Sequence, residues 1–271
     1  MTTDHTIVER EGGLVTITFN RPEKKNAIST TMWRELVAVL DELEESTEDR
    51  VLILTGAGDA FTSGADLAPD ELGSVADGEP SGPGGGFGAS VRSMRVVGRV
   101  ALRLHELHLP TIAAVNGVAV GAGCNLALGC DLIVAADTAR FSEIFARRGL
   151  SLDAGGSWLL PRLVGLHRAK ELAFLAEIIS AADAERLGLV NRVVPAAQLT
   201  TVVGELARRL AELPPVQLQI MKRQLNQSFS VSMAEALEFE DLTQAANFGS
   251  EDTAEALRAF LEHREPRFTG R

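Results

Sequence analysis

Cysteine is scarce in this chain of 271 residues, which contains only Cys124 and Cys130. Six positions apart on a helix, the two side chains point to different faces and cannot easily form a disulfide. Scarce, unpaired cysteine is typical of a reducing compartment. Residues 1–5 lack the pattern of a signal peptide, and no apolar run reaches the length of a membrane span. We therefore expect a cytoplasmic protein that does not act at a membrane.

Positive charge is also in short supply. The 26 lysines and arginines are outnumbered by 37 aspartates and glutamates, which gives a formal net charge of −11. No basic run stands out, so we expect no nucleic acid and no anionic membrane surface as the main partner. A small anionic ligand remains compatible with this charge, because local backbone dipoles can bind it.

Several familiar site motifs are missing as well. The chain has no Gly-Lys pair, hence no P-loop, and no G-x-S-x-G nucleophile elbow. His105 and His108 lie three positions apart, one fewer than the spacing of a zinc-binding helix, and the other histidines are scattered. We therefore expect no metal site.

The composition that remains is that of a soluble globular protein, with 45% hydrophobic and 23% charged residues. Expected strands alternate with expected helices up to about residue 197, and long amphipathic helices fill residues 198–271. This alternation predicts the α/β class with a helical C-terminal region. A loop at about 68–89 is rich in glycine and proline, and it is either a lid over a site or a disordered surface insertion.

The segment Asn116–Asp131 is the most informative part of the chain. The expected strand Thr111–Val115 leads into a glycine-bearing bend, which is followed by a buried helix. The first N–H groups of a helix have no intrahelical acceptor and lie at the positive end of its dipole, so they suit a negatively charged ligand atom. Asn125 is the polar exception in an apolar run and therefore needs a partner or a function.

A second bend, Ser63–Asp66, closes another short strand. If the two bends face each other, the N–H groups of Ala65 and Ala122 converge on one oxygen and form an oxyanion hole. The alternative is that each bend is simply a tight turn. Asp153 precedes a Gly-Gly helix start, and its position alone leaves open whether it caps that helix or acts as a catalytic acid.

Taken together, these features resemble the crotonase superfamily, the enoyl-CoA hydratase/isomerase family, over essentially the whole chain. The segments that carry the resemblance are Asn26–Ala27, Phe61–Asp66, Pro110–Gly117, Gly121–Cys124, Ala127–Asp131, Ala154–Gly156 and Arg267–Arg271. The resemblance implies a spiral of ββα units in residues 1–197 and a helical region, 198–271, that builds a homotrimer or a dimer of trimers. It also implies an acyl-CoA substrate whose CoA is part of the substrate, with no separate cofactor.

The resemblance further implies the residues of the site. Ala65 and Ala122 would hold the thioester oxygen. The implied substrate contacts are Lys24, Lys25, Asn26, Ala27, Ala60, Ser63, Gly64, Asp66, Leu67, Gly121, Phe145 and Phe260. In many relatives a Phe and a Lys from the next subunit touch the CoA; Phe260 is present here, but His263 replaces the Lys.

Departures from the family pattern bear on the reaction. Hydratases of the family use two glutamates, and their positions here hold Asn125 and Phe145. Because hydration must activate a water and deliver a proton, we do not expect efficient hydration. Glu143 lies two residues from the expected position, and we expect it to be a surface or structural residue. Asp153 falls where isomerases of the family have their acid, and Asp153–Gly165 is most similar to the ring-opening isomerase of phenylacetyl-CoA degradation, which also has an Asn matching Asn125.

The sequence therefore predicts an enoyl-CoA isomerase, of the Δ3,Δ2 type or the phenylacetyl-pathway type. Asp153 would move the proton, and Asn125 would orient the substrate or Asp153. Apolar neighbours such as Phe145 and Leu152 should raise the pKa of Asp153 towards that of a useful base. Two alternatives stay open, namely a hydratase that uses Glu143 and a non-catalytic acyl-CoA-binding protein.

Overall fold

The computed structural model describes residues 5–68 and 87–271. Its larger sheet has six strands in the order β1-β2-β3-β5-β7-β10. β1 and β2 form the expected antiparallel hairpin, and the other neighbours pair in parallel. The strands of this sheet are β1 (Thr6–Glu11), β2 (Leu14–Phe19), β3 (Val51–Gly56), β5 (Thr111–Val115), β7 (Leu132–Ala136) and β10 (Arg192–Val194).

A second sheet of four strands has the order β4-β6-β8-β9. Its strands are β4 (Ala60–Thr62), β6 (Val118–Val120), β8 (Arg140–Ser142) and β9 (Ile179–Ser180). The helices that follow the paired strands are α3 (Phe87–Glu106), α4 (Ala122–Leu128) and α5 (Gly156–Val164). The chain thus places β3, β5 and β7 in the first sheet, and β4, β6 and β8 in the second, before each helix. This is the spiral of ββα units that the sequence predicted.

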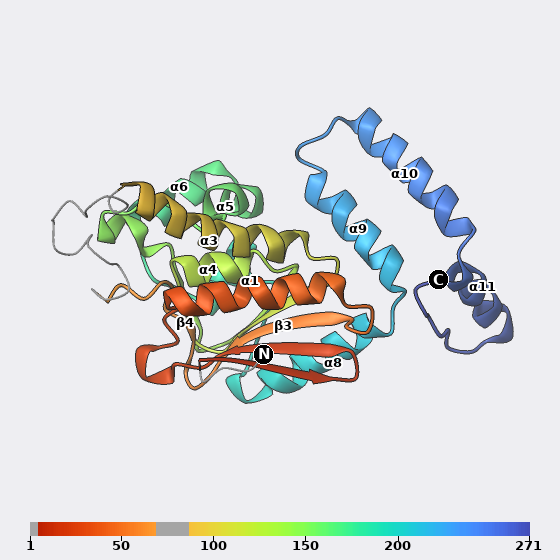
Figure 1. Cartoon of the computed structure of the whole chain (residues 1–271), viewed down its shortest axis with the longest axis horizontal. Helices are drawn as coiled ribbons and strands as arrows, with labels where there is room; N and C mark the ends of the chain where they lie inside the picture. The colour runs from red at the N-terminus through yellow and green to blue at the C-terminus, as the bar shows by residue number, and fades with distance from the viewer. Residues whose placement is uncertain (1–4, 69–86) are drawn as a thin grey trace.

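Helices cover one face of the larger sheet (Figure 1). α1 (Thr30–Glu45) begins as predicted, because the Ser29 hydroxyl accepts a hydrogen bond from the Met32 N–H at 3.2 Å. Its buried face packs against the sheet and α3. α6 (Leu166–Leu175) and α7 (Ala181–Leu187) follow α5. α6 packs against α5, and α7 packs against β8, β9 and β10. Burial of these apolar faces is the main stabilising contribution to the core.

α8 (Leu199–Ala211) covers the opposite face of the larger sheet. Leu199, Val203 and Ala207 are buried there in one cluster with β3, β5 and β7. The sequence placed the boundary of the helical C-terminal region at residue 197, but the core extends to the end of α8. The reason is that the apolar stripe of α8 shields the second face of a buried parallel sheet.

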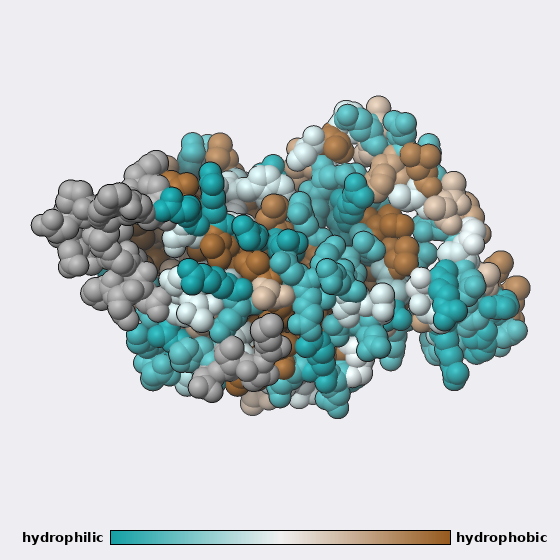
Figure 2. All heavy atoms as spheres, in the orientation of Figure 1, coloured by the Kyte–Doolittle hydropathy of each residue, from teal (hydrophilic) through white to brown (hydrophobic). Residues whose placement is uncertain are grey.

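The remaining helices project from the core as an arm (Figure 1). They are α9 (Pro215–Gln227), α10 (Met233–Phe248) and α11 (Glu251–Glu262), close to the ranges that the sequence predicted. Large hydrophobic side chains on the arm are largely exposed, among them Leu225, Phe229, Phe248 and Phe260. Figure 2 shows hydrophobic side chains on these helices. Extended exposed apolar surface of this kind marks an interaction face.

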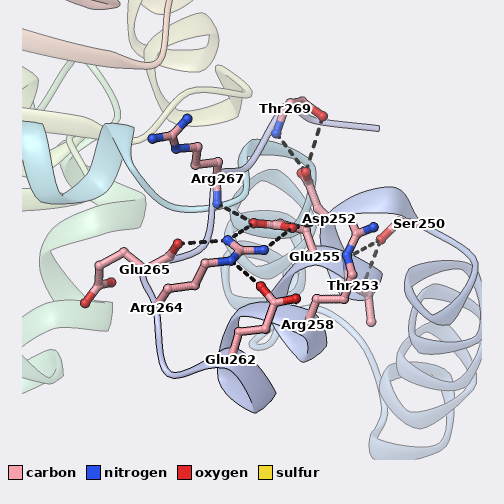
Figure 3. A network of polar contacts seen from close by, with 10 residues as sticks. All are labelled: Ser250, Asp252, Thr253, Glu255, Arg258, Glu262, Arg264, Glu265, Arg267 and Thr269. Carbon is pink, nitrogen blue, oxygen red and sulfur yellow. Dashed lines mark hydrogen bonds and ion pairs between the residues drawn. The ribbon is translucent and has the colours of Figure 1, made fainter.

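A polar network fixes the C-terminal tail against α11 (Figure 3). The buried Asp252 carboxylate accepts hydrogen bonds from the Thr269 N–H at 2.7 Å and the Gly270 N–H at 2.8 Å. The Glu255 carboxylate pairs with Arg264 at 2.6 Å and accepts from the Arg267 N–H at 3.1 Å. The acids of α11 therefore have partners in the tail.

Two strands of the second sheet, β6 and β9, were not predicted from the sequence. We expected β5 to lead directly into the bend before α4, but the chain crosses to the second sheet and forms β6 first. Gly117 permits this crossing, because a Cβ there would lie 1.9 Å from the Asp59 carbonyl oxygen. β9 has only two residues and gives no recognisable alternation.

Both cysteines are buried and free, in agreement with their spacing. Burial raises the pKa of the Cys124 and Cys130 thiols. Within residues 5–68 and 87–271, no helix combines the length and the apolar character needed to cross a membrane. Most of the glycine-rich loop, residues 69–86, lies outside the described residues, so its role as a lid or an insertion stays a hypothesis.

Candidate active site

The two bends expected to form an oxyanion hole lie against each other. β4 and β6 pair in parallel, so their carboxyl ends lie at the same edge of the second sheet. A Cβ at Gly64 would lie 2.6 Å from the Val120 carbonyl oxygen and 3.5 Å from the Ala122 nitrogen. A Cβ at Gly123 would lie 2.7 Å from the Thr62 carbonyl oxygen. Glycine is required at both positions for the bends to approach this closely.

The backbone leaves suitable donors at these bends. Ile28 forms a parallel bridge to Ala65, in which the Ile28 N–H donates to the Gly64 oxygen and the Asp66 N–H donates to the Ile28 oxygen. In such a bridge the N–H of Ala65 itself points away from Ile28. Ala122 is the first residue of α4, where the N–H has no intrahelical acceptor, and its φ is not positive.

Asp153 lies in the loop between the 3₁₀ helix Ile144–Arg148 and α5. It does not cap α5, because Gly155 holds the N-cap position and no side chain makes the capping hydrogen bond. The Oδ1 atom of Asp153 is buried and has no hydrogen-bond partner among the described residues. Burial raises the pKa of this carboxyl to about 6. The helix-cap alternative is therefore excluded, and what remains is a partly buried acid whose Oδ1 atom has no partner in the described part of the chain.

Asn125 connects α4 to the loop that carries Asp153. Its side chain is fully buried, and Nδ2 donates to the Asp153 carbonyl oxygen at 3.0 Å. The amide packs so tightly that a Cβ at Gly156 would lie 2.3 Å from Nδ2. Its Oδ1 atom has no partner among the described residues. Asn125 thus bonds to the backbone of the Asp153 loop, and its role in orienting the substrate or Asp153 stays a prediction.

Glu143 departs from one half of the sequence expectation, because it does not lie at the surface. We expected a surface or structural residue, on the argument that an offset of two residues rotates a helical side chain away. Glu143 instead directly follows strand β8, before the 3₁₀ helix begins, so the helical argument does not apply. Its side chain is 3% exposed, and neither carboxyl oxygen has a hydrogen-bond partner among the described residues. A polar residue at the end of a strand next to the predicted turn was the signal that could have identified it.

Burial also controls the protonation of Glu143. Burial is the main reason why the pKa of its carboxyl is raised to about 7, and the charge of Asp153 raises it further. The side chains of Cys124 and Asn125 lie close enough to lower this pKa in part. Glu143 and Asp153 therefore belong to one buried cluster of acids.

The expected CoA-binding turn is held by its own ion pairs. Asp66 is paired with Arg21 at 2.9 Å and Lys24 at 3.2 Å, and Lys25 pairs with Asp59. Burial alone would raise the pKa of Asp66, but the hydrogen bonds from the Ala68 N–H, Lys24 and Arg21 outweigh it and hold the pKa low. Sequence reasoning missed Arg21, a buried cation that orders this turn.

Asn26 has a structural role in the same turn. Its Nδ2 donates to the Ala57 and Ala60 carbonyl oxygens at 2.8 and 2.7 Å, and its Oδ1 accepts from the Arg21 N–H at 2.9 Å. The side chain is fully buried, so it has no free polar atom for a substrate. Any substrate contact of Asn26 would have to come from its backbone.

The other predicted contact residues divide into two groups. Ala27, Ala60, Gly64, Gly121 and Phe145 are buried around the bends, whereas Ser63 and Leu67 retain exposure. The Phe145 ring would lie 3.7 Å from a Cβ at Gly121, which places it beside the bend before α4. Phe260 lies on α11, far along the arm from α4 (Figure 1), so this copy of the chain does not bring it to the site.

A cavity of about 920 Å³ lies between α3, α5 and α9, but none of the predicted site residues lines it. Lys222 in its wall pairs with Asp131 at 2.8 Å, and the ring of His105 packs against Trp158. Its cationic and aromatic groups thus already have partners. The candidate site is the cluster of acids beside the two bends, not this cavity.

Comparison with known proteins agrees with this geometry. The family described as enoyl-CoA hydratase/isomerase matches residues 9–271. The chain is 39% identical over 261 residues to the 1,2-epoxyphenylacetyl-CoA isomerase of Escherichia coli K12. The aligned residues make up 96% of this chain and 97% of the relative. It is 35% identical over 267 residues to the short-chain-enoyl-CoA hydratase of Clostridium acetobutylicum, covering 98% and 97% of the two chains.

Solved structures show the same relationship. A putative enoyl-CoA hydratase from Streptomyces coelicolor superposes with a TM-score of 0.91 at 36% identity, covering 98% of this chain and 94% of the other. An enoyl-CoA hydratase from Bacillus anthracis superposes with a TM-score of 0.90 at 31% identity, covering 98% and 100%. The ββα spiral, the close bends and these similarities over nearly the full length lead to one conclusion. The chain belongs to the enoyl-CoA hydratase/isomerase family, the crotonase superfamily.

Proposed function

We propose that this protein is an enoyl-CoA isomerase that moves a double bond with a single carboxylate, Asp153. The observation that carries the proposal is the state of Asp153, whose Oδ1 atom is buried without a partner among the described residues and whose pKa is raised to about 6. A general base works best with a pKa near the working pH, and this value meets that condition. The 39% identity to a relative named as an isomerase supports the same reaction class.

The proposed reaction begins with a 3-enoyl thioester. Asp153 removes a proton from the carbon next to the thioester carbonyl, and the electron pair spreads over the carbonyl and the double bond. The N–H groups of Ala65 and Ala122 stabilise the resulting oxyanion. Asp153 then returns the proton to the γ carbon, so that the double bond ends in conjugation with the thioester. One acid suffices, because the proton leaves and returns on one face of the substrate.

The rest of the proposed site follows from the family. The CoA moiety would lie along the turn at Lys24–Ala27 and along residues 60–67, where Lys24 and Lys25 are exposed beside their aspartate partners. Phe260, on the arm, would reach the site of a neighbouring copy in a homotrimer or a dimer of trimers. The free, buried cysteines are compatible with the reducing cytoplasm. The reaction uses no cofactor other than the CoA of the substrate.

A hydratase is the second candidate function, and one observation favours it. Glu143 adds a second buried acid with a pKa of about 7 to the cluster that contains Asp153. Two carboxyl groups can divide the work of activating a water and delivering a proton. A relative at 35% identity is named as a short-chain-enoyl-CoA hydratase. A non-catalytic acyl-CoA-binding protein is the third reading, since neither family glutamate is present.

The test is to supply purified protein with a 3-enoyl-CoA and, separately, with a 2-enoyl-CoA. The isomerase predicts formation of the conjugated 2-enoyl-CoA, and Asp153→Asn should lower kcat by about 100- to 10,000-fold. Fast hydration of the 2-enoyl-CoA without isomerisation would support the hydratase. In that outcome Glu143→Gln should abolish the activity. CoA-ester binding without turnover of either substrate would support the binding protein.

A further inference from the structure

Thr62 is the last residue of β4, and its side chain lies between the two bends of the candidate site. The residue is fully buried. Its hydroxyl donates to the Asn26 carbonyl oxygen at 2.6 Å and accepts from the Gly64 N–H at 3.1 Å. The hydroxyl therefore joins the turn at Lys24–Ala27 to the bend at Ser63–Asp66, with one bond to the backbone of each.

The bond from the Gly64 N–H fixes the peptide that carries the first oxyanion donor. A threonine hydroxyl that accepts from the N–H two residues later closes a compact local turn. The Gly64 carbonyl oxygen in turn accepts from the Ile28 N–H at 2.8 Å. The C=O and N–H of a trans peptide point in opposite directions, so the Ala65 N–H points away from Ile28. Both polar groups of Gly64 are thus used, and together they set the direction of the Ala65 N–H.

The bond to Asn26 anchors this bend to a second, well-fixed segment. The Asn26 side chain is itself held by the Ala57 and Ala60 carbonyl oxygens. Next to Thr62, the Ser63 N–H donates to the Lys25 carbonyl oxygen at 2.9 Å, so the end of β4 is bonded to the turn at two successive residues. The turn proposed to carry CoA and the bend proposed to hold the thioester oxygen are therefore one connected unit.

The methyl group of Thr62 faces the second bend. A Cβ at Gly123 would lie 2.6 Å from the Thr62 Cγ2 atom and 3.2 Å from the Gly64 nitrogen. Gly123 follows Ala122 in the first turn of α4. The start of α4 therefore rests directly on Thr62, and this contact sets how closely the second oxyanion donor approaches the first.

We propose that Thr62 is a positioning residue that sets the geometry of the oxyanion hole. Its hydroxyl fixes the bend that carries the Ala65 N–H, and its methyl group fixes the distance from that bend to Ala122. Thr62 acts through the backbone and does not touch the substrate, because its side chain is fully buried. This inference rests on the proposed function, since the oxyanion hole belongs to the proposed reaction. A misplacement of about 1 Å in a reacting geometry can lower the rate about 100-fold, so small shifts of these donors matter.

The decisive comparison is between Thr62→Val and Thr62→Ser. Valine has nearly the shape of threonine but cannot hold the Gly64 N–H or the Asn26 carbonyl oxygen, so kcat for isomerisation should fall by about 10- to 100-fold. KM should stay within about threefold, because the oxyanion contacts strengthen mainly in the transition state. Serine keeps the hydroxyl and should restore kcat to within about threefold of wild type. An unchanged kcat in Thr62→Val, or an equal loss in both variants, would overturn the proposal.

A matched control removes another threonine hydroxyl from the core. Thr55 on β3 donates to the Ala114 carbonyl oxygen at 3.0 Å and touches neither bend, so Thr55→Val should keep kcat near wild type. If Thr62→Val does not fold, Thr62→Cys takes its place, because a thiol is only a weak donor and acceptor. Its kcat should lie clearly below that of Thr62→Ser, and equal values in the two variants would contradict the role of the hydroxyl.

A second measurement does not depend on turnover. Hydrogen bonds from Ala65 and Ala122 polarise a bound thioester carbonyl and lower its infrared stretching frequency. The probe is hexanoyl-CoA labelled with ¹³C at the thioester carbonyl, which has no double bond to move. Binding to wild type and to Thr62→Ser should lower the frequency, and binding to Thr62→Val should lower it less. A frequency that does not fall in wild type, or that falls equally in Thr62→Val, would refute the inference even if isomerisation is observed. If the protein does not isomerise, the proposed function fails, while the carbonyl band still decides whether Thr62 sets the oxyanion hole.

Discussion

Asp252 and Glu255, beside the C-terminal tail, have hydrogen-bond partners for their carboxyl groups (Figure 3). In the candidate site, by contrast, Asp153 and Glu143 have carboxyl oxygens without a partner among the residues that the structure describes. The guanidinium of Arg264 holds the pKa of Glu255 at about 2, while burial raises that of Glu143 to about 7. The surroundings thus lower the pKa of one glutamate and raise the pKa of another in the same chain. The paired acids hold the tail against α11, and the acids with raised pKa values are the candidates for proton transfer.

The two kinds of acid also affect folding stability in opposite ways as the pH changes. An acid whose pKa is lowered in the folded state stabilises the protein above its unfolded pKa, and this contribution is lost as the pH falls. An acid whose pKa is raised destabilises the folded state progressively as the pH rises towards the folded value. The tail acid Glu255 belongs to the first kind and the site acids to the second. The comparison can therefore be tested with both activity and stability.

The largest expected effect comes from adding a side chain at the point where the two bends are in contact. In Gly64→Ala the new Cβ would meet the Val120 carbonyl oxygen, at a φ of 93° that disfavours any side chain. The bends should separate and one oxyanion donor should be lost, lowering kcat by about 100- to 1000-fold. Steady-state isomerisation kinetics provide the measurement.

Gly249→Ala on the arm is the matched control for this substitution. Its Cβ would have only an ordinary contact of 3.5 Å with the Ala246 carbonyl oxygen. We expect kcat near wild type for this variant. Equal losses in both variants would show that the close approach of the bends has no special importance for the reaction.

The next effect is a gain of stability from an inactivating substitution. The pKa of Asp153 is raised from 3.8 to about 6, so its ionisation destabilises the fold by up to about 3 kcal/mol at pH values above this range. Asp153→Asn should therefore unfold at higher urea concentration than wild type at a pH of about 8. The two proteins should converge at a pH of about 3, where Asp153 is protonated in both states. A variant that is less stable than wild type at both pH values would contradict the account.

Asp252→Ala should have the opposite effect on stability. It removes the acceptor for the Thr269 and Gly270 N–H groups and should lower the free energy of unfolding by about 2 kcal/mol, as measured by urea denaturation. The pH dependence of isomerisation should not change, because the substitution does not touch the site. A shifted pH profile would show that the tail and the site are coupled.

Glu255→Gln should give the smallest effect. Its pairs with Arg264 and Arg258 lie at the surface of the arm, where solvent and salt screen the attraction. We expect a small loss in melting temperature that shrinks as salt is added. An effect that is independent of salt would indicate that packing, and not charge, is what Glu255 contributes.

Much of the fold could be predicted because its signals are local. The Gly12-Gly13 turn between two alternating segments predicts a hairpin, and Ser29 before an apolar stripe predicts the start of α1. Both signals depend on neighbouring residues, and the structure contains both features. The three-residue strand β6 could not be predicted, since its pairing with β4 and β8 is set by tertiary structure. The position of α8 on the sheet was missed for the same reason, because an amphipathic pattern does not specify which surface it covers.

The sequence predicted the parts of the candidate site that depend on backbone geometry. It did not predict the parts that depend on which side chains are buried. Glycines flanking Ala65 and Ala122 indicated two close bends, and the structure places them together. The burial of Glu143 was missed because the sequence does not show that a strand ends at Ser142 and places the next side chain in the core. Asn26 matched a family motif, yet its amide is fully used inside the turn.

The reactivity of the buried cysteines can show how often the region around α4 opens to solvent. Cys124 lies two residues after Ala122 in α4, and Cys130 lies just beyond the end of that helix. Since only the thiolate reacts with disulfide reagents, neither side chain should be modified while it remains buried with a raised pKa. The rate of labelling therefore measures how often the helix that carries the proposed oxyanion donor separates from the core. Bound acyl-CoA should slow that rate, so ligand affinity can be measured without any turnover.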